Sequence, residues 1–331
     1  MSDILDRLHL PFESRLPAFE GATTWLNSEP LTPESLRGRV ALVDFGTFTC
    51  INWIRTLPYV RAWNETYAAH GLATIGVQTP EFELERNLDS VRRSLAAMDV
   101  AYPVVVDNHF RIWDAFANRY WPALYLADHN GRIRYHHFGE GRYDETELAI
   151  QRLLRDAGAR DVPSDGVAVV PEGIEIEGDP HNDRSPETYI GWARAEGFVS
   201  PGGAVADDPH DYSVPNGLRR NQWALTGNWT IGREQAMTNE PGARLVLRFH
   251  ARDVNLIIAP TSSSAPVRVR VQLDGQRPDD AHGIDTDADG NGIVIEPRLH
   301  QLIRQRGSIE DKEIEIEFLD PGAAALCFTF G

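Results

Sequence analysis

The stretch Phe45-Gly-Thr-Phe-Thr-Cys50-Ile-Asn-Trp53-Ile-Arg-Thr-Leu-Pro58 decides how the first half of the chain is interpreted. It follows an apolar run that begins at Val40, which is typical of a strand buried on both faces of a sheet. Apolar residues at helical spacing come after Cys50, so this cysteine is expected to open a helix. Unpaired N–H groups and the positive end of the helix dipole favour a thiolate there. Cys50 is therefore the first candidate for a reactive group.

The first 160 residues alternate between strand-like and helix-like patterns. The elements expected after the helix at 51–70 are strands at 72–77, 102–106, 123–127 and 132–138, and helices at 84–98, 110–116 and 144–154. Asp128-His-Asn-Gly131 is a hairpin signal between two of these strands. Strand–helix alternation that ends in a hairpin and a helix predicts an α/β sheet, mostly parallel, with an antiparallel edge.

The second half of the chain has a period of two. Val267-Arg-Val-Arg-Val-Gln-Leu273 alternates between apolar and polar residues, and so does Ile314-Glu-Ile-Glu-Phe318. Several such strands separated by turn residues predict a β-sandwich of the jelly-roll type. Glycine and proline interrupt the region between the two halves. We therefore expect an α/β domain at 1–160, a linker at 161–186 and an all-β sandwich at 187–331.

Composition excludes several classes of protein. The net charge of −17 argues against a nucleic-acid partner, since phosphates require a basic face. We see no apolar run of about 20 residues and no secretory signal, so the sequence predicts no membrane span and a cytoplasmic location. The two cysteines, Cys50 and Cys327, make no disulfide framework or cysteine-based zinc site. We expect no metal and no cofactor.

Four motifs of the first half resemble a known family: Val43-Asp-Phe-Gly-Thr-Phe-Thr-Cys-Ile-Asn, Thr79-Pro-Glu-Phe82, Asn118-Arg-Tyr-Trp-Pro122 and Arg134-Tyr-His-His-Phe-Gly-Glu-Gly141. They are similar to the thioredoxin-like region of DipZ-type proteins, which are relatives of the TlpA/ResA thiol–disulfide oxidoreductases. In the second half, Ser185-Pro-Glu-Thr-Tyr, the stretch from Gly290 to Arg304 and Phe328-Thr-Phe-Gly331 resemble the sandwich that follows in this family, which is similar to a carbohydrate-binding module. The resemblance implies a thioredoxin fold and redox chemistry.

The chain departs from the family where the chemistry takes place. The family pattern is Cys-x-x-Cys, whereas Trp53 stands at the second position here. In the paired form the first thiolate attacks a disulfide and the second cysteine resolves the mixed disulfide. Cys50 is therefore expected to act as a monothiol nucleophile, resolved by a partner protein's thiol or by a low-molecular-weight thiol.

The residues around Cys50 receive roles on this interpretation. Thr49 and the helix N-terminus would stabilise the thiolate. The resemblance implies that Pro122 follows a cis peptide bond and positions the substrate, with Trp121 beside it. Glu81 is either a proton carrier or a solvated loop carboxylate.

Two other functions compete with monothiol exchange. A redox-inactive binding protein would use a cleft lined by Trp53, Phe48 and Trp121 to hold a partner segment. A peroxidase is the lesser alternative, because Thr47 and Cys50 have the spacing of the peroxiredoxin Thr-x-x-Cys motif.

Three further patterns have an ordinary structural explanation that we weigh above the functional one. His136 and His137 are neighbours in a strand and point to opposite faces, so they do not chelate a metal together. Asp285-x-Asp287-x-Asp289-Gly290 with Glu296 has the spacing of a calcium loop, but its flanks are not helical. A weak possibility of sugar binding rests on three tryptophans of the sandwich, which are more often core residues: Trp192, Trp223 and Trp229.

Overall fold

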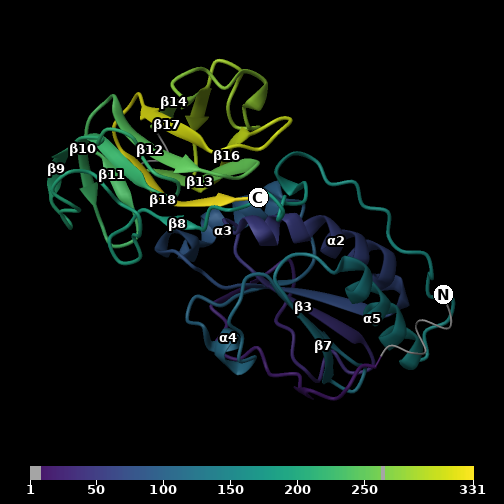
Figure 1. Ribbon diagram of the computed structural model, residues 1–331. Helices are drawn as coiled ribbons and strands as arrows, with labels where there is room; N and C mark the ends of the chain where they lie inside the picture. The colour runs from purple at the N-terminus through teal and green to yellow at the C-terminus, as the bar shows by residue number, and fades with distance from the viewer. Residues whose placement is uncertain (1–8, 262–264) are drawn as a thin grey trace. The chain divides into compact units, whose positions relative to one another are not determined.

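The chain divides into two compact units, Met1–Glu175 and Ile176–Gly331, and each is described by itself (Figure 1). The computed structural model describes residues 9–261 and 265–331. Within these residues, no helix is both long enough and apolar enough to cross a membrane.

The first unit is built on a seven-stranded sheet in the order β1-β7-β6-β3-β4-β5-β2. Strands β3, β4 and β5 run parallel, whereas β6, β7, β1 and β2 each pair antiparallel with their neighbours. The strands are β1 (Ser14–Arg15), β2 (Thr24–Leu26), β3 (Val40–Gly46), β4 (Leu72–Gln78), β5 (Val104–Val106), β6 (Ala123–Ala127) and β7 (Arg132–Phe138). The predicted α/β class with an antiparallel edge is confirmed.

Strand β3 is central to this sheet because its neighbours cover it on both edges and all of its residues are buried. Helices follow the strands: α2 (Ile51–Tyr67) with the short η1 (Ala68–His70), η2 (Glu83–Arg86), α3 (Leu88–Ala97), α4 (Arg111–Ala115) and α5 (Tyr143–Asp156). Helices α2 and α5 pack side by side, where Tyr59 stacks on Tyr143 with ring centroids 3.6 Å apart (Figure 1). The end of β3 therefore delivers the chain directly into the first turn of α2.

The helix predicted at 84–98 is wrong in its first part. Residues 83–86 form the separate 3-10 turn η2, and α3 begins only at Leu88. The side chain of Asn87 accepts a hydrogen bond from the Ser90 N–H (3.0 Å), which caps α3 at that point. This break matters for the site, because the short turn carries a buried glutamate.

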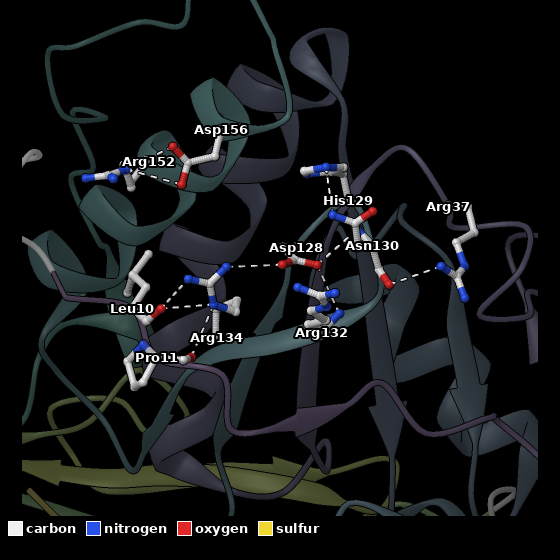
Figure 2. Close-up of polar contacts among 10 residues, drawn as sticks. All are labelled: Leu10, Pro11, Arg37, Asp128, His129, Asn130, Arg132, Arg134, Arg152 and Asp156. Carbon is white, nitrogen blue, oxygen red and sulfur yellow. Dashed lines mark hydrogen bonds and ion pairs between the residues drawn. The ribbon is translucent and has the colours of Figure 1, made fainter.

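The hairpin between β6 and β7 is held by a buried carboxylate (Figure 2). Asp128 accepts the N–H groups of Asn130 (2.9 Å) and Arg132 (3.0 Å) and pairs with the guanidinium of Arg134 (3.2 Å). Arg134 also donates through Nε to the carbonyl of Leu10 (2.9 Å), which ties the chain before β1 to this edge. The turn predicted at Asp128 is confirmed.

The second unit is all-β, with strands that curl into two layers sharing β10. Residues 223–226 of β10 pair with β12, whereas residues 227–231 pair with β9 and β11. Gly227, with φ of +82°, stands where the strand changes layer, a backbone conformation that glycine adopts without strain. The strands are β8 (Thr188–Tyr189), β9 (Pro209–Tyr212), β10 (Trp223–Ile231), β11 (Ala236–Thr238), β12 (Ala243–Phe249), β13 (Asp253–Pro260), β14 (Val267–Leu273), β15 (Asn291–Val294), β16 (Arg298–Arg304), β17 (Lys312–Phe318) and β18 (Ala323–Phe330).

Apolar residues from both layers form one core, which includes Leu245 and Val269 from one layer and Leu256 and Phe328 from the other. The predicted all-β second domain is confirmed as a sandwich-like arrangement. Between α5 and β8 the described chain forms one short turn, η3 (Gly173–Glu175), and otherwise has no regular element.

Candidate functional site

Cys50 stands immediately before the first residue of α2, where its side chain is half-buried. Its N–H donates to the carbonyl of Thr47 (3.0 Å), and its own carbonyl accepts the N–H of Ile54 (3.0 Å), so the first turn of the helix closes on it. The Cys50 Sγ lies 3.9 Å from the carbonyl oxygen of Trp121. The structure thus places the cysteine at the helix N-terminus, as predicted, and against the loop that precedes β6.

The loop beside Cys50 contains a cis peptide bond between Trp121 and Pro122. The indole of Trp121 donates to the carbonyl of Thr79 (3.1 Å), and its ring lies 4.3 Å from that of Trp113. These contacts fix the Trp121 backbone whose carbonyl faces the cysteine. The structure therefore brings together Cys50, Trp121 and Pro122 as the sequence predicts.

The side chain of Trp53, three residues after Cys50 in α2, turns into the core beside β3. Its side chain is 3% exposed, and its Nε1 donates to Asp44 Oδ2 at 3.0 Å. The indole lies directly over Gly46, where a Cβ atom would come within 2.1 Å of Trp53 Cδ1. The indole of Trp53 therefore occupies the space that a side chain at position 46 would need.

The cleft lining predicted from Trp53, Phe48 and Trp121 needs correction. Phe48 is fully buried and Trp53 nearly so, whereas Trp121 alone keeps a partly exposed side chain. Both rings lie in the core because the removal of their apolar surface from water stabilises the fold. Neither has surface left with which to hold a partner segment.

Asp44 is a buried carboxyl that the sequence interpretation did not single out as a functional residue. Its Oδ2 accepts from Trp53 and, at 3.5 Å, from the Tyr102 hydroxyl, while its buried Oδ1 has no hydrogen-bond partner among the described residues. Burial raises the pKa of Asp44 to about 7, against the opposing effect of these two hydrogen bonds. Asp44 therefore changes charge near neutral pH at the atom that accepts the hydrogen bond of the Trp53 indole.

Glu85 is a second buried carboxyl, located on η2. It accepts the hydroxyl of Thr49, the N–H of Glu81 and, at 2.9 Å, the N–H of Phe82. Burial raises the pKa of Glu85 to about 7, although these hydrogen bonds favour the ionised form. The Thr49 hydroxyl is thus directed at Glu85, and Glu81 contributes its backbone to the same carboxylate.

The hydroxyl of Thr47 is engaged within this buried network. It accepts a hydrogen bond from Gln78 Nε2 at 2.7 Å, and it also bonds to Glu85, where it favours the ionised carboxylate. Thr47 itself is fully buried. The peroxidase alternative stays a prediction.

Asp44 and Glu85 differ in how readily the sequence shows that they are buried. Asp44 stands alone in the otherwise apolar β3, and a single carboxylate in a strand buried on both faces is a recognisable signal. Glu85 follows Glu81 and Glu83 in an acidic loop, and nothing in the sequence distinguishes the one that is buried. The catalytic roles assigned to Thr49, Pro122 and Glu81 stay predictions.

Four of the residues considered for metal binding have other partners. His136 pairs with Glu13 (2.8 Å), Asp285 with Arg298 (2.5 Å) and Asp289 with Arg277 (3.1 Å). Asp287 instead accepts backbone N–H groups of its own turn. Among residues 9–261 and 265–331, no group of three or more histidines, cysteines or carboxylates is arranged to hold a metal ion.

The tryptophans considered for sugar binding separate into two kinds. Trp223 and Trp229 are fully buried, and the ring of Trp229 meets that of Phe318 edge-on at 5.4 Å. The core explanation is confirmed for these two. Trp192 is 38% exposed and donates to Asp207 Oδ1 (3.1 Å).

Comparison with known proteins agrees with this architecture. Residues 185–331 match a family described as the thioredoxin like C-terminal domain. Protein DipZ of Mycobacterium tuberculosis is 35% identical over 257 residues, which are 76% of this chain and 36% of that protein. The thiol-disulfide oxidoreductase YkuV of Bacillus subtilis is 26% identical over 141 residues, 43% of this chain and 95% of YkuV. The solution structure of a thioredoxin-like protein in the oxidized form is 28% identical, covers 43% of this chain and 96% of its own, and has a TM-score of 0.41.

The chain thus spans about a third of the length of the DipZ proteins that it matches. Its first unit has a thioredoxin-like fold, with Cys50 at the start of the helix after the central strand. The chain is similar to the DipZ-type thioredoxin-like proteins over most of its length, and its first half is similar to a thiol–disulfide oxidoreductase.

Proposed function

We propose that this protein carries out thiol–disulfide exchange with Cys50 as its one nucleophilic thiol and with an external thiol as the resolving group. The observation that supports it best is the contrast between positions 50 and 53 of the same helical turn. Cys50 is half-buried at the helix N-terminus, whereas Trp53 is buried and bonded to Asp44. The other cysteine, Cys327, is 1% exposed within β18 of the second unit.

The proposed cycle has two exchange steps. The Cys50 thiolate attacks one sulfur of a substrate disulfide, forming a mixed disulfide and releasing the other sulfur as a thiolate, which takes a proton from solvent. An external thiolate then attacks the substrate sulfur of the mixed disulfide. This second step forms a new disulfide between the external thiol and the substrate and returns Cys50 as a thiolate. After the cycle the protein is neither oxidised nor reduced.

The substrate in this proposal is a protein disulfide, and the resolving group is a protein thiol or a low-molecular-weight thiol. Trp121 and Pro122 would meet the substrate backbone, because their loop lies against the cysteine sulfur. The cycle needs a supply of reduced thiols, which the cytoplasm maintains. It therefore fits the cytoplasmic location expected from the sequence, which cell fractionation would check.

Trapping of the mixed disulfide tests the proposal. A Cys327→Ser protein is incubated with glutathione disulfide, and its intact mass is followed before and after reduced glutathione is added. We expect one glutathione adduct on Cys50 that forms in the folded protein and disappears on addition of the thiol. The matched control, which also carries Cys50→Ser, should form no adduct.

A Trp53→Cys variant sharpens the test. With a resolving thiol restored at this position, the adduct should be released without added glutathione, as an intramolecular disulfide forms. A wild-type cysteine that forms no adduct until the protein unfolds would refute the proposed exchange.

A further inference from the structure

Glu85 joins the two segments that flank the candidate nucleophile. On one side it accepts the hydroxyl of Thr49, the residue that immediately precedes Cys50. On the other side it accepts backbone N–H groups of Glu81 and Phe82, which follow β4. One hydrogen bond and one peptide unit therefore separate this carboxylate from the cysteine.

The same two segments also make the surroundings of the thiol. Thr47, whose carbonyl accepts the Cys50 N–H (3.0 Å), is linked to β4 through Gln78 (2.7 Å). Thr79, the next residue, accepts the indole of Trp121 (3.1 Å), whose carbonyl faces the sulfur. A change in how Glu85 holds these segments is thus transmitted to both sides of Cys50.

Resting on the function proposed above, we propose that Glu85 is a positioning residue for Cys50: through Thr49 it holds the peptide that presents the thiol, and its negative charge opposes formation of the thiolate. The carboxylate is fully buried, so solvent screens its charge little. Three donors, from Thr49, Glu81 and Phe82, hold it in one place.

The charge on Glu85 changes in the pH range where a thiol of this kind would work. Burial raises the pKa of Glu85 to about 7, and the negative charge of Glu81 contributes in the same direction. The hydroxyls of Thr47 and Thr49, which also bond to this carboxylate, are uncharged. Below this pH the neutral acid does not repel a thiolate, and above it the carboxylate does.

The test is the pH dependence of Cys50 alkylation by iodoacetamide in a Cys327→Ser background. Glu85→Gln removes the charge but keeps an oxygen for the backbone donors, so we expect the midpoint of the rate profile to move to lower pH and the rate near pH 7 to rise several-fold. Thr49→Val removes the link but leaves the carboxylate. We expect it to lower the rate at high pH several-fold and not to reproduce the shift.

Glu83→Gln is the matched control, because Glu83 lies on the same turn but its side chain is 80% exposed. Its profile should coincide with that of the parent protein. A merely structural role of Glu85 would change the yield of folded protein and leave the midpoint in place. A Glu85→Gln profile with the parent's midpoint, or a Thr49→Val rate at high pH equal to the parent's, would overturn the proposal. Where Glu85→Gln does not fold, Thr49→Val still tests whether the hydrogen bond to Glu85 positions the thiol.

Alkylation needs no disulfide partner, which separates this inference from the proposed function. A parent protein that forms no glutathione adduct, together with a shifted profile in Glu85→Gln, would refute disulfide exchange and support the role of Glu85. Adduct formation with unshifted profiles would support exchange and refute the role of Glu85.

Discussion

Asp44 and Glu85 are both buried carboxyls with a pKa raised to about 7, but their surroundings differ. Asp44 has donors on one oxygen only, from Trp53 at 3.0 Å and Tyr102 at 3.5 Å, and its other oxygen has no hydrogen-bond partner in the described part of the chain. Glu85 receives donors on both oxygens, from Thr49 on one and from two backbone N–H groups on the other.

The difference shows how one fold can use a buried acid in two ways. A carboxylate with few donors is costly to ionise, and its neighbours are held mainly by packing. A carboxylate with several donors links the backbone segments that carry those donors. Asp44 is therefore tied to the packing of Trp53, and Glu85 to the position of the segment before Cys50.

Among changes around Asp44, truncation of Trp53 should lower the free energy of unfolding most. Trp53→Ala leaves a cavity and removes the better donor to Asp44, so we expect the free energy of unfolding to fall by about 3–5 kcal/mol. Chemical denaturation near pH 7 measures it. Tyr120→Ala, at a position 53% exposed in the same unit, is the control and should cost less than about 1 kcal/mol. Equal losses in the two variants would show that the indole is not a core element.

Replacement of Asp44 tests its ionisation. Because its pKa is raised from 3.8 to about 7 in the folded protein, its contribution to stability is complete below pH 3.8 and is lost as the pH rises to about 7. The loss is on the order of 1.4 kcal/mol for each unit of pKa difference. Asp44→Asn cannot ionise, so its free energy of unfolding should fall less over this range than that of the parent.

The exposed Asp89→Asn is the control for this measurement, since the Asp89 side chain is 77% exposed on α3. It should follow the parent's pH dependence. Parallel curves for Asp44→Asn and the parent would mean that Asp44 does not titrate in the folded protein.

The fit between Gly46 and Trp53 gives the smallest of the three effects. Gly46→Ala places a Cβ atom against the indole, so we expect it to destabilise the protein by roughly 1–3 kcal/mol. In a Trp53→Ala background the same change should cost much less, because the colliding ring is gone. A double-mutant cycle from denaturation curves measures this coupling, and identical costs in both backgrounds would contradict it.

The sequence predicts those features that depend on a local pattern of residues. The helix start at Cys50, the hairpin at Asp128 and the alternating strands of the second unit follow from periodicity and turn residues, and all are confirmed. The burial of Glu85 could not be predicted because it depends on how η2 packs: of the three acidic residues in this loop, Glu85 is buried, Glu81 is half-buried and Glu83 is exposed. The side chain of Trp53 was likewise undetermined, since its direction depends on the space above Gly46, a tertiary property.

Because glycine has no side chain, position 46 also limits the order in which substitutions at positions 46 and 53 can occur. Any residue with a Cβ atom at this position collides with the indole as it lies here. Starting from a larger residue at 46, a glycine must therefore come first or together with the tryptophan. The reverse path differs, because loss of the tryptophan requires nothing of residue 46. A change at 53 therefore meets no steric barrier from position 46, and a cysteine at 53 would need no accompanying substitution there.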